Sequence, residues 1–366
     1  MKVAVVHYWW LSNRGGEAVV SSIISAFPEA DIFIHVCDKE LILKTLGPAY
    51  RGKVYTTFIA KLPGAKKHYQ KYLPLMPLAL EQLDLTEYDL VISSESGPAK
   101  GVITRPDALH VCYCHSPMRY VWDMYYSYLQ GSGRLIKLLF PLVAHWLRIW
   151  DLASASRVDI FIANSTFVAK RIKKFYRRES TVVFPPVNVA DFDYTQPRGD
   201  FYLYLGQLVT YKRADLVLEV FNQLNLPLVV IGEGELYDDL IKRAGPNIKL
   251  LGRQSFESVK DHLQRCKALV FPGLEDFGIV PVEAMAAGAP VIAYGKGGAL
   301  DTVINGETGI LFDEQTHECL TDAVMALEQG NYKFDPIKLH EHAKKFEKPI
   351  FVNQFKAVID KALQEE

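Results

Sequence analysis

The sequence lacks several features that would mark particular classes of protein. Its five cysteines are odd in number and scattered over 366 residues, so they do not form a disulfide framework. Cys112 and Cys114 stand two apart in an apolar stretch, which is not the spacing of zinc ligands, and we expect reduced core thiols. Lysine and arginine number 41 against 42 aspartates and glutamates. Because there is no basic excess, we expect no nucleic-acid partner.

The sequence also has no stretch typical of a membrane span or a signal peptide. No uninterrupted apolar run approaches the length that crosses a bilayer. Residues 1–6 are mostly apolar, but polar residues 12–14 follow soon and no small-residue cleavage site appears, so a buried first strand is expected. We therefore expect a cytoplasmic protein, peripheral on the inner face of the cell membrane.

What the sequence does contain is a regular alternation of short β-branched runs and helical patterns. The length favours two domains, and an apolar content of 49% gives each domain enough material for a core. Continuous apolar strands of this kind predict parallel sheets covered on both faces, that is, two doubly wound α/β domains. The expected strands are 3–6, 31–36, 54–58, 89–93, 110–114 and 159–163, followed by 201–205, 228–231, 248–251, 268–271, 291–294 and 310–312.

A proline-rich segment separates the two sets of strands. Residues 185–188 and 197–200 hold three prolines and few periodic positions, which is typical of a linker. We predict an N-terminal domain at 1–190, a C-terminal domain at 191–348, and a terminal helix at 349–366 that packs back on the N-terminal domain. The expected core face of this helix is Phe351, Phe355, Val358 and Leu363.

The strongest motif places two glutamates eight residues apart, Glu275 and Glu283, across a strand-to-helix turn. Pro281 suits the first helical position, which would put Glu283 in the first turn. The N–H groups of residues 278–280 then precede the helix and can bind an anion or sugar hydroxyls. Ordinary helix capping is the alternative role for Glu283.

A second motif joins a strand to a basic pair. Gly206 and Gln207 end the strand, and Lys212 and Arg213 follow. Two cations at this place can neutralise a diphosphate leaving group. The alternative is a solvated basic surface.

Two motifs of the first half lie at the ends of strands. Gly15 and Gly16 follow the first strand and open a helix expected at 18–27, so their N–H groups can approach a phosphate or a sugar. His115 ends the strand at 110–114, at the edge where such sheets bind ligands. A satisfied structural histidine is the alternative.

Together these motifs resemble the large retaining glycosyltransferase family 4, whose two-lobed fold is called GT-B. The resemblance rests on the glutamate pair, on 14–17, 115–117, 251–253, 271–273 and 290–293, in the expected order. It implies two Rossmann-like domains facing across a cleft, the N-terminal one binding the acceptor and the C-terminal one the nucleotide-sugar donor.

The resemblance also implies a role for each motif residue. The catalytic set would be His115, Lys212, Arg213 and Glu275, and the donor-binding set Gly15, Gly16, Gly206, Gln207, Arg253, Phe277, Gly278, Ile279, Val280 and Glu283. Glu283 would hold the ribose hydroxyls, and Glu275 and His115 would lie by the sugar. The family commonly has arginine where this chain has Gln207; either Arg213 supplies that charge or the leaving group is held more weakly.

The residues at 211–213 and 275–278 resemble those of mannosyltransferases that use GDP-mannose and a lipid-linked oligosaccharide in polysaccharide assembly. The absence of an Asp-x-Asp motif near a strand end means that no metal is required to explain the charge balance, and we expect no cofactor. A nucleotide-sugar epimerase of the same fold and a non-catalytic nucleotide-sugar-binding subunit remain alternatives, the latter because of Gln207.

Two stretches of the first half combine cations with large apolar residues. Residues 61–78 hold lysines and tyrosines before a Leu/Pro/Met run, and residues 134–150 hold arginines, a lysine and tryptophans among leucines. Such a composition favours contact with an anionic membrane surface. For 134–150 a long core helix with snorkelling cations is an equal alternative.

Overall fold

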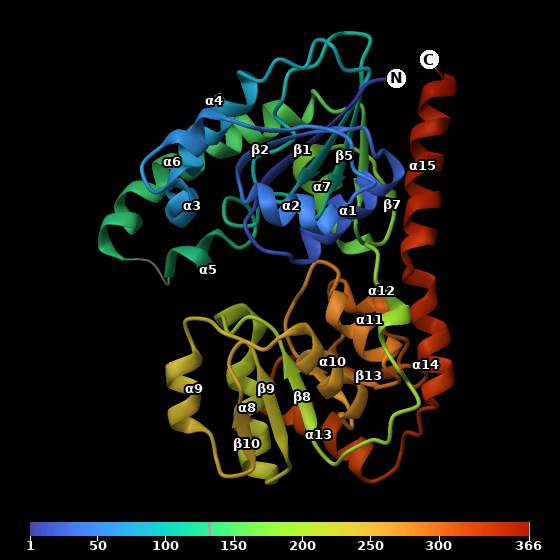
Figure 1. Cartoon of the computed structure of the whole chain (residues 1–366). Coiled ribbons are helices and arrows are strands. Elements are labelled where there is room, and N and C mark those ends of the chain that lie inside the picture. The colour runs from blue at the N-terminus through green and yellow to red at the C-terminus, as the bar shows by residue number, and fades with distance from the viewer. Residues whose placement is uncertain (131–132, 366) are drawn as a thin grey trace. The chain divides into compact units, whose positions relative to one another are not determined.

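The computed structural model describes residues 1–130 and 133–365, and the chain divides into two compact units (Figure 1). The first unit is Met1–Pro186 together with Phe351–Glu366, and the second is Val187–Ile350. Residue 366, the end of the expected terminal helix, lies outside the described residues. Each unit is built around one parallel sheet with helices on its faces, which confirms the predicted fold class.

The sheet of the first unit has seven strands in the order β3-β2-β1-β4-β5-β6-β7. Its strands are β1 (Val3–Trp10), β2 (Asp31–Cys37), β3 (Val54–Thr56), β4 (Leu90–Glu95), β5 (Leu109–Cys114), β6 (Ile160–Ala163) and β7 (Thr181–Val182). Its helices are α1 (Gly15–Ala26), α2 (Lys39–Leu46), α3 (Ala65–His68), α4 (Met76–Glu81), α5 (Tyr125–Gln130), α6 (Arg134–Ala155) and α7 (Thr166–Tyr176). The sequence did not predict β7, because two residues are too few to show a period.

Both faces of this sheet are covered, because alternate side chains of a strand point to opposite faces. Val3 and Val5 of β1 join a core cluster with residues of α1 and α2. Ala4 and Val6 join the other cluster, which includes Leu80 of α4 and residues of α6. This is why the central strand is apolar at every one of these positions, without polar alternation.

The terminal helix α15 (Lys348–Glu365) adds residues to the core of the first unit. Phe351, Phe355 and Ile359 are almost fully buried there, at the four-residue spacing that keeps side chains on one helix face. The prediction of Leu363 as a core residue was wrong, since 39% of it is exposed. Ile359 takes the position that continues the buried stripe.

The sheet of the second unit has six strands in the order β10-β9-β8-β11-β12-β13. Its strands are β8 (Tyr202–Leu205), β9 (Leu228–Ile231), β10 (Ile248–Leu250), β11 (Leu269–Phe271), β12 (Val291–Tyr294) and β13 (Gly309–Phe312). Its helices are α8 (Ala214–Leu224), α9 (Tyr237–Arg243), α10 (Phe256–Arg265), α11 (Ile279–Ala286), α12 (Ala299–Thr302), α13 (His317–Glu328) and α14 (Pro336–Ala343).

A fully buried group of charges ties α6 to the sheet of the first unit. The ammonium of Lys100 lies 3.4 Å from a carboxylate oxygen of Glu95, at the end of β4, and is also paired with Asp151 of α6. The indole N–H of Trp122 and the hydroxyl of Tyr176 donate hydrogen bonds to Asp151. Burial alone lowers the pKa of Lys100, but the two carboxylates raise it above its usual value, so Lys100 is held in its charged form.

Candidate functional site

In the second unit, an ion pair lies where the sheet topology changes direction. From β8 the chain moves outward to β9 and β10, whereas β11 lies on the other side of β8 and leads to β12 and β13. Ligands of doubly wound sheets bind at such a switch point, outside the carboxyl ends of the strands. Lys212 follows β8 and Glu275 follows β11, and the lysine Nζ lies 2.7 Å from Oε1 of Glu275. The exposed fractions of these side chains are 22% and 15%, so a ligand can reach both.

Gly206, directly after β8, lies beside this pair. A Cβ placed on Gly206 would lie 3.6 Å from Cδ of Lys212, so the lysine side chain passes over this residue. Gln207 is exposed next to it and brings no charge. Lys212 is therefore the cation that the structure brings to Glu275.

Arg213 occupies a different position from Lys212. Its backbone is left-handed, with φ of 55°, at the residue before α8. Its guanidinium lies 3.3 Å from Asp215 and donates to the carbonyl oxygen of Gln315 at 3.2 Å. Its role at the leaving group therefore stays a prediction, as does that of Arg253, which is exposed just after β10.

The turn between Glu275 and Glu283 differs in one respect from the prediction. Helix α11 begins at Ile279 after Gly278, so Pro281 is its third residue and Glu283 lies beyond its first turn. Gly278 has φ of 88°, a conformation that side chains other than glycine rarely adopt. The amide groups of Ile279 and Val280 are among those that an α-helix leaves without internal partners, and both residues are partly exposed.

The position of Glu283 excludes the capping interpretation. The residue before the helix is Gly278, no side chain caps it, and its first turn holds no acidic residue. Burial raises the pKa of the Glu283 carboxyl to about 7, and the nearby charge of Asp191 adds to this effect. The predicted role of Glu283 in binding the ribose hydroxyls stays a prediction.

Two further contacts fix the loop that carries Glu275. The N–H of Gly298, after β12, donates to the carbonyl oxygen of Glu275 at 2.9 Å. Phe277 is buried, and its ring lies 5.7 Å from that of Phe346. The Phe277 side chain is therefore not available to a donor, and a contact of its backbone stays a prediction.

The first unit has its own switch point, between β1 and β4, and polar side chains meet there as well. His7 of β1 is paired in register with Ser94 of β4. The hydroxyl of Ser94 lies 3.1 Å from Nδ1 of His7 and 2.8 Å from Nε2 of His115, directly after β5. His7 and Ser94 are fully buried, whereas His115 is partly exposed.

The glycine pair of the first unit lies beside this cluster. Helix α1 begins at Gly15, three residues before the expected start, so Gly15 and Gly16 form its first turn. A Cβ on Gly16 would come within 2.6 Å of the Tyr8 hydroxyl and 3.8 Å of Cε1 of His7. The structure thus brings Gly16 close to His7, and Ser94 joins His7 to His115.

His7 and Ser94 were not predicted from the sequence. Polar residues inside apolar strands were the available signal, since a buried polar side chain needs a partner. The buried charges of Lys100, Glu95 and Asp151 were not predicted either. Among the described residues, no three histidine, cysteine, aspartate or glutamate side chains lie close enough together to hold a metal ion.

Comparison with known proteins matches both units. Residues 13–191 match the model of Glycosyltransferase Family 4, and residues 194–348 match that of Glycosyl transferases group 1. The chain belongs to glycosyltransferase family 4. This confirms the resemblance that the glutamate pair and the glycine motifs predicted.

Several known proteins resemble the chain in sequence or structure. An uncharacterized glycosyltransferase of Methanocaldococcus jannaschii is 30% identical over 46% of this chain and 49% of its own. Human alpha-1,3/1,6-mannosyltransferase ALG2 is 27% identical over 66% of this chain and 65% of its own. The chain thus spans about half to two thirds of the length of these relatives. The crystal structure of Anabaena HepE in complex with UDP is 14% identical, covers 99% of this chain and 100% of its own, and has a TM-score of 0.68, a likeness that shows the GT-B fold.

This family-4 chain exposes a large apolar surface on one side of its first unit. We call it the α6 surface; its exposed residues are Leu135, Ile136, Leu138, Leu139, Leu142, Trp146, Ile149 and Leu152. The opposite side of the same helix packs in the core through Ala144, Leu147 and Trp150. None of the helices in the described ranges is both long and apolar enough to span a bilayer.

The segment at 61–78 presents a similar mixture. Lys61, Lys66, Lys67 and Lys71 are exposed, and so are Leu75 (40%) and Leu78 (50%). Glu81, at the end of α4, accepts a hydrogen bond from the indole of Trp150 at 3.1 Å. Because this bond joins α4 to α6, the two segments belong to one side of the first unit (Figure 1).

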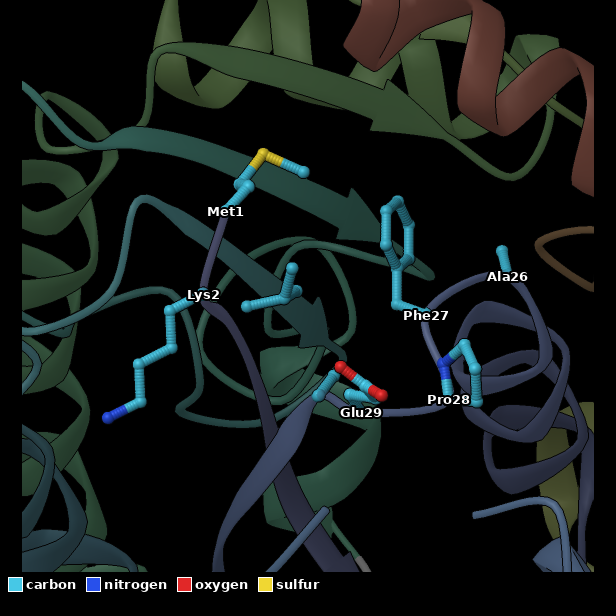
Figure 2. Close-up of a pocket in the computed structure, with 8 residues that line it drawn as sticks. Met1, Lys2, Ala26, Phe27, Pro28 and Glu29 are labelled. Carbon is cyan, nitrogen blue, oxygen red and sulfur yellow. The ribbon is translucent and has the colours of Figure 1, made fainter. Parts of the chain in front are cut away.

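A separate hollow of about 510 Å³ lies at the amino end of the first sheet (Figure 2). It is lined by residues 1–3, at the start of β1, and 26–30, before β2. None of the predicted site residues contributes to it. It lies away from the strand ends that carry the polar clusters.

Proposed function

We propose that the chain is a retaining glycosyltransferase that moves a hexose, mannose from GDP-mannose, onto a lipid-linked oligosaccharide in cell-surface polysaccharide biosynthesis. The observation that carries the proposal is the Lys212–Glu275 ion pair at the switch point of the second sheet. In the proposal Lys212 supplies a cation for the diphosphate, Glu275 a carboxylate for the sugar hydroxyls, and the first amide groups of α11 further hydrogen-bond donors.

The chemistry follows from the charges at this site. The bond between the sugar C1 and the diphosphate oxygen breaks while a bond from C1 to the acceptor oxygen forms on the same face. The acceptor hydroxyl passes its proton to the departing phosphate oxygen, so no side-chain base is needed. The Lys212 ammonium has three N–H donors, so it can stabilise the developing phosphate charge while it keeps Glu275 in place. We propose that no metal takes part.

The choice of donor rests on resemblance and on one relative. The motif at 211–213 and the mannosyltransferase name of human ALG2 support mannose. The UDP in the HepE crystal structure makes uracil the competing base. Glu283 would accept hydrogen bonds from the ribose hydroxyls of either nucleotide.

The choice of acceptor is supported by the α6 surface. Leucine, isoleucine and tryptophan side chains lie there beside exposed Arg134, Lys137 and His145. Such a face suits the boundary between anionic headgroups and acyl chains. A transferase docked on the inner face of the cell membrane in this way would meet a lipid-linked substrate.

One assay separates the proposal from its alternatives. The purified chain is incubated with GDP-mannose, UDP-glucose and UDP-N-acetylglucosamine, each with and without lipid extract and with or without EDTA. Transfer of mannose to lipid, unaffected by EDTA, is expected. Isomerised donor without acceptor would identify an epimerase, and nucleotide binding without turnover a non-catalytic subunit.

Membrane docking is tested with vesicle flotation. The double substitution Leu138→Glu and Leu142→Glu places charges at positions that are 71% and 72% exposed, so folding should be unaffected. We expect it to abolish binding to anionic vesicles. The control is Leu43→Glu on α2, which is 53% exposed and lies outside the α6 surface. Equal loss in both variants, or none in either, would contradict the docking site.

A further inference from the structure

A single hydroxyl group joins two histidine rings at the switch point of the first unit. Oγ of Ser94 lies 3.1 Å from Nδ1 of His7 and 2.8 Å from Nε2 of His115. A hydroxyl has one proton, so Ser94 donates to one ring and accepts from the other. The positions of the ring protons of the two histidines are therefore coupled.

Both rings are neutral near pH 7. Burial lowers the pKa of His7 to about 3, and the neighbouring His115 contributes in the same direction. Burial lowers the pKa of His115 to about 4. Two arrangements of the protons are then possible. Ser94 donates either to His115, which leaves a proton on Nδ1 of His115, or to His7, which leaves Nδ1 of His115 bare.

The environment of His7 distinguishes these arrangements. Its Nε2 is buried and has no hydrogen-bond partner among the described residues. If Ser94 donated to His7, this nitrogen would carry a buried N–H without an acceptor. In the other arrangement it is a bare acceptor, and unsatisfied acceptors are tolerated more often than unsatisfied N–H groups.

We propose that His7, acting through Ser94, holds His115 in the tautomer with its proton on Nδ1, so that His115 presents a hydrogen-bond donor to a bound sugar. His7 is a positioning residue, because it acts only through Ser94 and His115. The part of the inference that concerns the sugar rests on the proposed function. The part that concerns the tautomer does not.

The consequence for the reaction is one of orientation. A neutral N–H group fixes an oxygen of the sugar but removes no proton from it. In the other tautomer, Nδ1 of His115 would accept a hydrogen bond instead, and the preferred position of the sugar would change. Loss of the relay should therefore lower kcat without changing the affinity for the nucleotide alone.

The test uses the full chain with ¹⁵N-labelled histidine. Nitrogen chemical shifts and long-range couplings identify the protonated nitrogen, and a His115→Asn sample assigns the resonance. We expect Nδ1–H at His115 in the wild type and a shift toward Nε2–H in Ser94→Ala. His7→Asn, which keeps an amide donor near Nδ1, should retain the wild-type tautomer, whereas His7→Phe should not.

Activity supplies the second measurement. Ser94→Ala should lower kcat about tenfold, as for the loss of one hydrogen bond, with an unchanged Kd for GDP. His7→Asn should keep most of the wild-type kcat, whereas His7→Phe should lower it as Ser94→Ala does. Nε2–H at His115 in the wild type, or Nδ1–H retained in Ser94→Ala and in His7→Phe, would overturn the inference. If the wild type transfers no sugar, the proposed function fails, while the spectra still decide whether His7 sets the tautomer.

Discussion

The two units carry polar clusters at the same topological place but of opposite character. In the first unit the cluster is neutral and mostly buried, because a serine hydroxyl joins two histidines whose pKa values burial has lowered. In the second unit it is ionic and partly exposed, because Lys212 pairs with Glu275. Corresponding strand ends of the two sheets thus carry different chemical groups.

On the proposed function, the second unit would serve the diphosphate, because Lys212 supplies positive charge there. The neutral cluster of the first unit suits hydrogen bonds to an uncharged ligand such as a sugar. The first unit also contains ions, but Lys100, Glu95 and Asp151 are fully buried. We expect those charges to affect stability and the exposed pair to affect activity.

The largest effect should come from the buried charges. Lys100→Met leaves Glu95 and Asp151 buried without a cation, which should cost about 3–5 kcal/mol of unfolding free energy. In thermal denaturation, the first unit should unfold at a lower temperature than in the wild type. Lys44→Met, at an exposed lysine of the same unit, is the matched control. An unchanged transition in Lys100→Met would remove the distinction between structural and functional charges.

A comparable effect, on activity instead of stability, is expected at the exposed pair. Lys212→Gln should lower kcat about 10²- to 10³-fold, because the leaving phosphate loses its cation. The melting temperature should change little, since partly exposed ion pairs contribute about 0–1 kcal/mol to stability. Lys249→Gln, exposed in the same unit, is the control. Full activity in Lys212→Gln would show that the ion pair of the second unit has no role in the reaction.

The third effect is a pH dependence of nucleotide binding at Glu283. Its pKa of about 7 means that the carboxyl is largely protonated at lower pH, and the ionised form accepts hydrogen bonds more strongly. GDP should bind up to about tenfold more tightly at pH 8 than at pH 6, as measured by calorimetry. Glu283→Gln should bind weakly at both values. An equal pH dependence in the Gln variant would assign the titration to another group.

The raised pKa of Glu283 also predicts that the free energy of unfolding depends on pH, in the direction opposite to nucleotide binding. A folded-state pKa above the usual 4.5 means that the folded chain holds more protons than the unfolded one between these values. Stability therefore falls as the pH rises from about 4.5 to about 7. In thermal denaturation, Glu283→Gln should not show this fall in stability between pH 4.5 and pH 7.

The smallest effect is expected at Arg213. Because its guanidinium is engaged with Asp215 and Gln315, Arg213→Ala should lower kcat less than about tenfold, or about 1.4 kcal/mol in barrier height. A loss as large as that of Lys212→Gln would show that Arg213 replaces the charge absent at Gln207.

The apolar runs of the sequence were sufficient to predict the strands longer than two residues, and the glycines and prolines marked their loops. Helix starts were predicted less well. Gly15 was expected in a turn ahead of a helix, whereas it begins α1, and α11 begins at Ile279 instead of at Pro281. A glycine is compatible with a turn and with a helix start, so local pattern does not separate these cases.

The sequence by itself determined the two parallel sheets and the residues that stand at the ends of their strands, because continuous burial imposes an apolar pattern that can be seen locally. Tertiary structure decided which of those residues meet. His7, Ser94 and His115 are far apart in the sequence, and they come together only because β1, β4 and β5 are neighbours in a fixed register. The order and register of strands depend on how whole helices pack on the sheet, so the pairing of these side chains is not encoded in any single stretch.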